Sequence, residues 1–298
     1  MIKNTIITGQ KSTDTTFFSP MANLEGWPFP GFNIEDIALP RFNHIYLDGM
    51  SNVDIDNVSI LGGLVNAPNG NALSRPGNCN GIRILSPAPD NHGVENITIR
   101  NCNINDMQAV GDSESHGIYI SDGKNMCIEN NCINGIQYMD IVQLEKGPDG
   151  RNPFAGKTKL IVNQGGIGHG IHLENCHAVN IENNKIMGSS ANGIHIDGYS
   201  SGLCVDNNKT KNNLKGFVVG SNGSISDSIF TKNTALLNVD DGFELLVGNA
   251  GIKVQYFNNH SQSNGTNYDI NGVIGFSTYD ISMGTQNGPN SLKPNTFA

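Results

Sequence analysis

Two stretches of the chain place a histidine and an acid at the same spacing. In GIHLE the pair is His172 and Glu174, and in GIHID it is His195 and Asp197. An imidazole exchanges protons near neutral pH, and carboxylates serve as acids or bases. Two histidines with two carboxylates also offer four ligands to a divalent ion. These four residues are the first candidates for chemistry.

The two stretches belong to a repeat. A Gly followed by alternating apolar residues acts as an anchor that recurs along the chain, and His44 begins a weaker copy: Gly81, Gly117, Gly170, Gly193, Gly216, Gly242 and Gly272. Each unit ends in an Asn: Asn57, Asn101, Asn130, Asn183, Asn207, Asn233 and Asn258. A unit of about 23 residues is too short for a strand-helix-strand crossover and suits one coil of a parallel solenoid.

The repeat predicts how each coil folds. Alternating apolar residues turn one side of each strand inward, and Asn tolerates the left-handed backbone of a sharp turn. Stacked Asn side chains also bond from coil to coil. We therefore predict an all-β chain, a right-handed parallel β-helix of about eight coils over residues 43–275. Residues 1–42, which include Trp27, are predicted to form an N-terminal cap, and residues 276–298 a C-terminal cap or tail.

The repeat resembles that of a known group. HGIYISDGKNMCIENN (116–131) and HGIHLENCHAVNIENN (169–184) are similar to the parallel β-helix repeats of the pectate-lyase-like superfamily. The superfamily includes polysaccharide lyases, glycoside hydrolases, uronan epimerases and phage tailspikes. The resemblance implies a polysaccharide or oligosaccharide partner and an extracellular or virion-surface location. A homotrimer is the assembly expected for a tailspike-like role.

No subfamily follows from the motifs. GHG at 168–170 matches a fragment of the polygalacturonase signature, but Asp240 and Asp241 follow it, whereas the Asp pair precedes it in that family. The Asp-Pro-His signature of alginate epimerases is absent from the sequence.

Extra segments enter the repeat at one corner. The distance from the Asn of one unit to the next anchor is 24, 16 and 40 residues in the first three units, then 10, 9, 9 and 14. The extra residues fall at about 61–79, 105–115 and 134–165. Insertions on one face of a solenoid often build its binding face. We expect these loops to wall a groove.

The alternation also predicts an outward face. Two residues after each anchor stand Tyr46, Arg83, Tyr119, His172, His195, Val218 and Glu244. Four residues after it stand Asp48, Leu85, Ser121, Glu174, Asp197, Gly220 and Leu246. Because coils stack about 4.8 Å apart, the two histidines and two acids should form a square flanked by Tyr119 and Arg83. His116 and His169 precede their anchors at the loop corner, and with Tyr46 and Asp48 they are predicted to bind substrate.

Three chemistries fit this face. In β-elimination or epimerisation of a uronosyl residue, Arg83 would neutralise the carboxylate and Tyr119 would protonate the leaving oxygen, while His172 or His195 would take the C5 proton. In hydrolysis, Glu174 and Asp197 would act as acid and base. In a metal site, the two histidines and two acids would hold Ca²⁺ or Zn²⁺.

Composition narrows the partners. The chain has 298 residues and a net charge of −9, without the basic runs that a nucleic acid requires. No apolar stretch approaches a membrane span, and MIKNTIITGQ shows no signal peptide. The six cysteines lack metal-ligand spacing and are predicted to be free.

The alternative function is a non-catalytic, tailspike-like or adhesin-like protein that binds glycans. A long apolar outward stripe would mark it, and the outward columns offer only Leu85, Val218 and Leu246.

Overall fold

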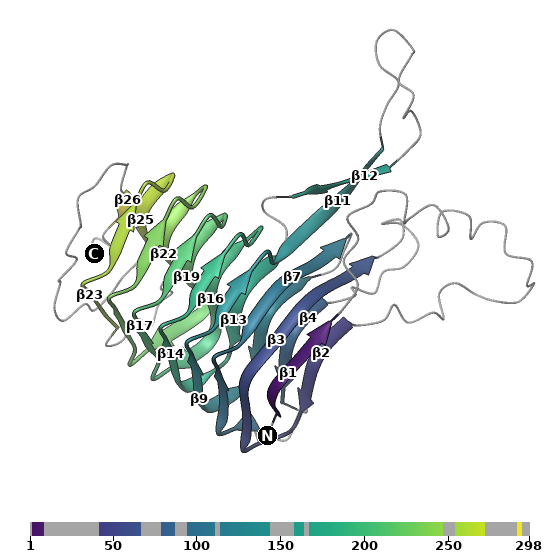
Figure 1. The fold of residues 1–298 in the computed structure, drawn as a ribbon. Helices are drawn as coiled ribbons and strands as arrows, with labels where there is room; N and C mark the ends of the chain where they lie inside the picture. Colours follow the sequence, from purple (N-terminus) through teal and green to yellow (C-terminus); the bar gives the residue numbers. More distant parts are fainter. Residues whose placement is uncertain are drawn as a thin grey trace, which may run out of the picture.

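The computed structural model describes residues 2–8, 42–66, 79–86, 94–110, 114–143, 158–163, 167–246, 254–271 and 291–293. These residues form strands β1 to β26 and no helix. Figure 1 shows the strands stacked one behind another, from β1 near the N-terminus to β26 near the C-terminus. None of the described residues forms a helix long and apolar enough to cross a membrane.

Each coil contributes a strand to a first parallel stack. Its members, in pairing order, are β2 (Phe42–Asp48), β4 (Cys79–Leu85), β8 (Ser115–Ser121), β13 (Gly168–Glu174), β16 (Asn192–Ser201), β19 (Lys215–Ser226), β22 (Asp241–Leu246), β25 (Thr266–Asn271) and β26 (Ser291–Lys293). Consecutive members of the first stack come from consecutive coils, which is the pairing that the repeat predicts.

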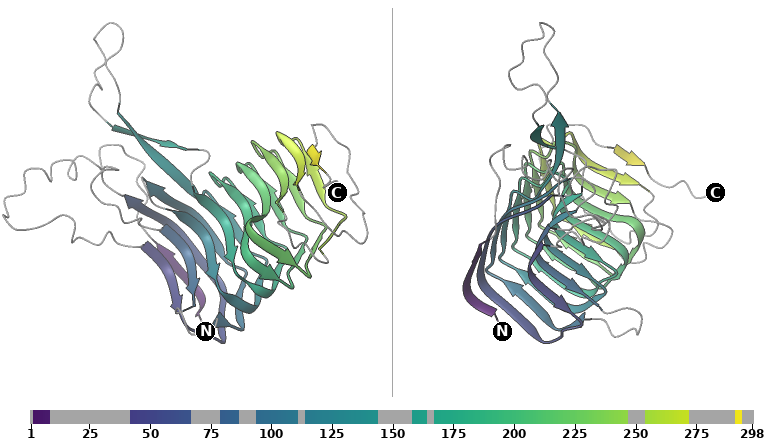
Figure 2. Two further views of the ribbon diagram at one scale, coloured as in Figure 1. Left: turned by 180° about the vertical axis from the view of Figure 1, so that it is seen from behind. Right: turned by 90° about the vertical axis from the view of Figure 1, so that its right-hand side faces the viewer.

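Two further parallel stacks close each coil. The second stack holds β1 (Ile2–Thr8), β3 (Val53–Asn66), β6 (Ile97–Arg100), β9 (Gly123–Glu129) with β5 (Val94–Glu95) beside it, β14 (His177–Glu182), β17 (Cys204–Asp206), β20 (Ile229–Thr231) and β23 (Gln255–Phe257). The third holds the end of β3, β7 (Asn103–Val110), β10 (Cys132–Asn134), β15 (Lys185–Met187), β18 (Lys209–Lys211), β21 (Thr234–Leu236) and β24 (His260–Gln262). Figure 2 shows the stacks from two further sides.

The predicted right-handed parallel β-helix is therefore the fold of this protein. The number of coils stays a prediction, because several segments lie outside the described residues. The two caps also stay predictions. Strands β1 and β26 pair with the stacks at their two ends, but residues 9–41, which include Trp27, lie outside the described part. All six cysteines are free, as expected, and Cys79, Cys102 and Cys176 are buried.

The core is a set of stacked columns inside the coils. One residue after the anchor, Ile82, Ile118, Ile171 and Ile194 are fully buried. The column continues in rings, since Phe217 stacks on Phe243 at 4.6 Å between centroids and Phe243 on Tyr268 at 5.4 Å. Burying one such side chain contributes about 1.5–3 kcal/mol. The apolar column therefore holds consecutive coils in register.

The anchor glycines face the next coil too closely for any side chain. A Cβ on Gly117 would lie 2.6 Å from the carbonyl oxygen of Gly170, and one on Gly242 would lie 2.7 Å from that of Asn267. The second contact corrects the last predicted unit. Asn267, and not Gly272, occupies the anchor position, because Phe243 pairs with Tyr268. Gly272 lies outside the described residues.

The turn asparagines behave as predicted, with one exception. Asn57, Asn101, Asn130, Asn183, Asn207 and Asn258 all have φ between 53° and 57°. In the unit before the last, Lys232 takes this conformation, with φ of 54°, and the predicted Asn233 points into the coil. The residues that follow the turns form a buried column of amides: Asn131, Asn184, Asn208, Asn233 and Asn259.

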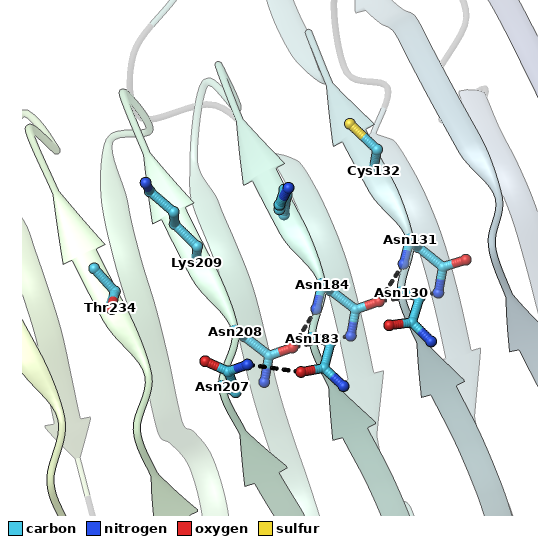
Figure 3. A pocket seen from close by; sticks show the side chains of 10 residues that line it. Asn130, Asn131, Cys132, Asn183, Asn184, Asn207, Asn208, Lys209 and Thr234 are labelled. Atoms are coloured by element: carbon cyan, nitrogen blue, oxygen red, sulfur yellow. Dashed lines mark hydrogen bonds between the residues drawn. The ribbon is translucent and has the colours of Figure 1, made fainter.

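Figure 3 shows part of this corner, where turn and buried amides bond between neighbouring coils. The corner encloses a hollow of about 540 Å³ lined mainly by amide and lysine side chains. Its amides are engaged in coil-to-coil bonds, so the hollow belongs to the scaffold.

The inserted segments do begin side by side. Strand β7 pairs with the end of β3, and β11 (Gln137–Gln143) pairs with β7, for example Gln137 with Gln108. Strand β12 (Thr158–Val162) returns antiparallel along β11. Figures 1 and 2 show these strands reaching past the stacks at one edge. Residues 67–78, 111–113, 144–157 and 164–166 lie outside the described residues, so the groove wall stays a prediction.

Candidate functional site

The outward columns have the predicted register. Pairing of the first stack places Tyr46, Arg83, Tyr119, His172, His195, Val218 and Glu244 on consecutive strands. The second column runs through Asp48, Leu85, Ser121, Glu174 and Asp197. It stops there, because an irregularity after Ile196 pairs Gly198 with Gly223 instead of continuing to Gly220.

A third outward column was only partly foreseen. It holds the residues one position before the anchors: Asn43, Asn80, His116, His169, Asn192, Lys215 and Asp241. Strict alternation would turn these residues inward. The strand pairing skips the anchor glycine, and the His116 ring instead lies 5.1 Å from that of Tyr119 and 5.2 Å from that of His172. Reading this column along the whole repeat would have revealed its polarity.

Four histidines from β8, β13 and β16 form one cluster, which we call the histidine cluster: His116, His169, His172 and His195. The rings of His172 and His195 stack at 4.6 Å between centroids, and His169 and His195 also lie 4.6 Å apart. His116 and His169 are only 1% and 6% exposed. The predicted substrate-binding histidines thus contact the predicted catalytic ones.

Backbone geometry fixes the protons on two of these rings. The Asn192 amide donates to Nδ1 of His169 at 3.2 Å, so a neutral His169 carries its proton on Nε2. That nitrogen lies 3.4 Å from Nδ1 of His195 and donates to it. His195 then carries its own proton on Nε2, which lies 3.8 Å from Oδ2 of Asp197. Both histidines are therefore held in defined tautomers.

His172 differs from its neighbours. Both its ring nitrogens are buried, and neither has a hydrogen-bond partner among the described residues. A neutral imidazole carries one proton and one lone pair, so His172 presents an unused donor and an unused acceptor. Buried polar groups are nearly always paired in proteins. Such an exception points to a role with a ligand.

The cluster is neutral at pH 7. Burial, followed by the neighbouring histidines, lowers the pKa of His169 and of His172 well below the ordinary value of 6.5. Burial also lowers the pKa of His195 to about 4, although Asp197 opposes the shift. Burial lowers the pKa of His116 against the effect of Glu114, whose carboxylate lies 3.4 Å from its Nε2. Of these four rings, His172 is the one that keeps both its lone pair and its N–H without a partner among the described residues.

A proton donor and a cation adjoin the cluster. The Tyr119 hydroxyl donates to Oε2 of Glu174 at 2.7 Å. Burial, and then this carboxylate, raises the pKa of Tyr119, so the phenol keeps its proton. The guanidinium carbon of Arg83 lies 5.3 Å from the centre of the Tyr119 ring. Arg83, Tyr119 and Glu174 thus come together as predicted.

The remaining predicted site residues lie at the edges of the histidine cluster. Asp197 is 8% exposed, and its Oδ1 accepts the Gly198 amide at 2.8 Å. Tyr46 and Asp48 are exposed and face each other, with 3.5 Å between the hydroxyl and a carboxylate oxygen. Arg83 separates Tyr46 from Tyr119 along the column. The two residues therefore stand beside the cluster on the same face.

On the next two strands of the first stack, β19 and β22, the same face carries an ion-pair network that sequence reasoning missed. Lys215 Nζ lies 2.9 Å from Asp241 and 2.8 Å from Glu244. Burial opposes the ammonium charge, but the two carboxylates outweigh it and raise the pKa of Lys215. Burial raises the pKa of Asp241 and of Glu244. With Asp269, these acids could hold a metal ion by distance, but the Lys215 ammonium already occupies the space between Asp241 and Glu244 and offsets part of their charge.

The metal-ligand set differs from the predicted one. His169, His172 and His195 offer three ligand atoms that all lie within 4.8 Å of one another. The predicted carboxylates are not part of this group. Glu174 instead accepts a hydrogen bond from Tyr119, and Asp197 accepts one from the Gly198 amide. Three nitrogen donors suit zinc-like ions, whereas Ca²⁺ takes oxygen ligands.

Known proteins resemble this chain in fold alone. No family model and no curated protein matches it. Among solved structures, the pectate lyase Pel9A matches with 14% identity and a TM-score of 0.34, over 80% of this chain and 68% of that one. XylC in complex with xylose matches with 15% identity and a TM-score of 0.29, over 69% and 35%. The tailspike protein of E. coli bacteriophage HK620, a double mutant in complex with a pentasaccharide, matches with 10% identity and a TM-score of 0.27, over 76% and 46%. At such scores no activity is transferred.

Proposed function

We propose that this protein is a polysaccharide-active enzyme that works on uronosyl residues by β-elimination or epimerisation, on the outward face of the first stack. The observation that carries the proposal is His172, a neutral imidazole whose two buried nitrogens have no partner among the described residues. Tyr119, a protonated phenol, lies next to it, with 5.1 Å between ring centroids. A proton acceptor and a proton donor on one face are what this chemistry needs.

The residues take complementary roles in elimination. Arg83 neutralises the substrate carboxylate, which makes the C5 proton more acidic. His172 takes that proton, and the electron pair forms the C4–C5 double bond as the C4–O bond breaks. Tyr119 leaves Glu174 and gives its proton to the leaving oxygen. In epimerisation the same base acts, and a proton returns to the opposite face of C5.

One observation favours hydrolysis as a second candidate. Glu174 and Asp197 are register partners on adjacent strands, whose backbones lie about 4.8 Å apart, so their carboxyl groups can approach the separation of about 5 Å used by retaining glycosidases. Their engagement with Tyr119 and Gly198 makes this the weaker candidate.

A panel of uronate and neutral polysaccharides tests the proposal. Ultraviolet absorbance reports unsaturated products, proton exchange at C5 reports epimerisation, and reducing ends report hydrolysis. We expect uronate substrates to react and His172→Ala to lower the rate by about 100-fold or more. His177→Ala, at an exposed histidine on β14, serves as the matched control. If no polysaccharide is altered, the proposal fails, and glycan binding without turnover becomes the interpretation to test. The protein's assembly and location in the tailspike-like alternative remain predictions.

A further inference from the structure

We propose that His169, His172 and His195 together bind one divalent transition-metal ion of the zinc class. The three side chains come from β13 and β16, whose backbone pairing fixes their positions. Their ligand atoms all lie within 4.8 Å of one another. In a tetrahedral zinc site with Zn–N bonds near 2.1 Å, ligand nitrogens are about 3.4 Å apart. The three nitrogens must therefore move closer together, through side-chain rotation, when the ion binds.

One edge of the site already has this spacing. Nε2 of His169 and Nδ1 of His195 are separated by 3.4 Å, and a single proton lies between them. A divalent ion between the same two nitrogens takes the place of that proton. A neutral imidazole binds a metal through its lone pair, so the His169 proton moves from Nε2 to Nδ1 and no net proton is released.

The third ligand gives independent support. His172 is the member whose two nitrogens are buried without a partner among the described residues. One of its nitrogens lies within 4.8 Å of the other two ligand atoms. Its ring is stacked on that of His195, with planes 14° apart, so the ring must turn to aim its lone pair at a shared ion. A cation shared with His169 and His195 would satisfy the lone pair that the protein leaves unused.

Loading has one identifiable cost. His169 must carry its proton on Nδ1 when Nε2 binds the ion, which ends the 3.2 Å hydrogen bond from the Asn192 amide. One long hydrogen bond is weak beside three metal–nitrogen bonds. Asp197, 3.8 Å from the outer nitrogen of His195, supplies the carboxylate that usually orients a metal-bound histidine.

The proposed metal site and the proposed reaction, on which this part of the inference rests, both use the lone pair of His172. An imidazole that binds metal has no lone pair left to act as a base, so a loaded site would use a metal-bound water as the base in the uronosyl reaction. Metal binding itself needs no substrate. A protein that binds the ion and alters no polysaccharide overturns the proposed function alone, and a metal-free lyase overturns this inference alone.

The test titrates the full-length, metal-stripped protein with Co²⁺. We expect one Co²⁺ per chain, with visible d–d absorbance that one equivalent of Zn²⁺ abolishes. His169→Ala, His172→Ala and His195→Ala should each weaken binding by about 100-fold or more, because even an outer partner of a metal ligand is worth 10- to 100-fold. His→Gln variants, with circular dichroism, show that the protein still folds when a ligand is lost.

His116→Ala and His177→Ala are the controls. His116 lies in the histidine cluster but outside the trio, and His177 is exposed on β14. Both should keep one Co²⁺ per chain with unchanged affinity. Absence of stoichiometric binding overturns the inference, as does binding that survives in all three trio variants or is lost in the His177 control.

Discussion

Two polar columns run through adjacent coils of this protein, and they differ in how far their hydrogen bonds are satisfied. In the buried column of amides, Oδ1 of Asn208 accepts both the backbone and side-chain N–H groups of Asn184, at 3.0 and 2.9 Å. The Asn208 side chain then donates to Ile181 and to Asn233. In the histidine cluster, His172 has no such partner among the described residues, although its nitrogens are equally shielded.

The difference separates scaffold from site. A fully paired polar column specifies the register of the coils and adds stability. An unpaired buried polar group costs about 1–3 kcal/mol. Among the described residues, single unpaired atoms also occur in the scaffold, for example on Thr210 and Tyr256, whereas His172 leaves both its ring nitrogens unpaired. The amides and His172 are both polar and buried. What distinguishes His172 is that both its ring nitrogens lack a hydrogen-bond partner in the described part of the chain, so this lack is a better guide to function here than polarity alone.

The largest effect should follow from breaking the amide column. Asn208→Leu leaves the Asn184 amide and the Ile181 carbonyl buried without partners, so the free energy of unfolding should fall by about 3–5 kcal/mol. Urea unfolding followed by circular dichroism measures it. Asn180→Leu, at an exposed position on β14, should change stability by less than about 0.5 kcal/mol. Equal effects of the two changes would contradict the scaffold role.

Acid should weaken the protein through the histidine cluster. Above pH 6.5 these histidines are neutral in both folded and unfolded chains and contribute no pH dependence. As pH falls below 6.5 the unfolded chain takes up protons first, so stability falls until the folded pKa is reached. For His195, with a pKa of about 4, the loss is about 3 kcal/mol between pH 6.5 and 4.

The measurement compares urea unfolding of the wild type and His195→Leu at pH 7.5, 5.5 and 4.5. Carboxylates titrate in the same range, so the difference between the two proteins isolates the histidine. His169, His172 and Asp197 face this ring and are unchanged in the variant. Parallel pH profiles for the two proteins would refute the prediction.

The ion-pair network should respond to loss of its cation. Lys215→Met leaves Asp241 and Glu244 without their ammonium, and stability at pH 8 should fall by about 2 kcal/mol, less than for a fully buried pair because Lys215 is 20% exposed. The loss should shrink near pH 4, where the acids of the variant take up protons. Lys209→Met, at an exposed lysine, should be neutral at both pH values.

The smallest effect has the opposite sign. His172→Leu replaces an unpaired polar ring with an apolar side chain of similar size, so the free energy of unfolding should rise by about 1 kcal/mol while ligand binding and activity are lost. Thermal and urea unfolding measure the gain, and His177→Leu gives the reference. Destabilisation by His172→Leu alone would mean that His172 serves the scaffold.

Much of the fold and of the candidate site could be predicted from the sequence because the repeat is regular. The two-residue alternation after each anchor correctly placed Tyr119, His172 and His195 in one outward column. The same rule failed one residue before the anchor, where the rings of His116 and His169 lie with Tyr119 and His172 on the outward face. The strand pairing skips the glycine between these positions, and a simple alternation does not encode such an interruption.

Other details depend on contacts between distant residues. The last anchor was misplaced because Asn267 stands where the other units have glycine. Lys232 was missed at a left-handed turn, since its neighbour Asn233 looked the better candidate. The tautomers of His169 and His195 follow from one backbone amide on the next strand, and no pattern of side chains announces it.

Because the stacked anchor glycines are alike, a whole coil can be inserted into or deleted from this protein as a unit. Each anchor glycine faces the carbonyl of the next anchor, so any two coils carry matching surfaces at this corner. Excising the 26 residues from Lys215 to Asp240 would rejoin such surfaces and place Asp241 directly after Asn192 in its column. Glu244 would then stand beside His195. Gain or loss of a single coil could thus move a carboxylate next to the histidines, recombining existing chemistry without a new residue.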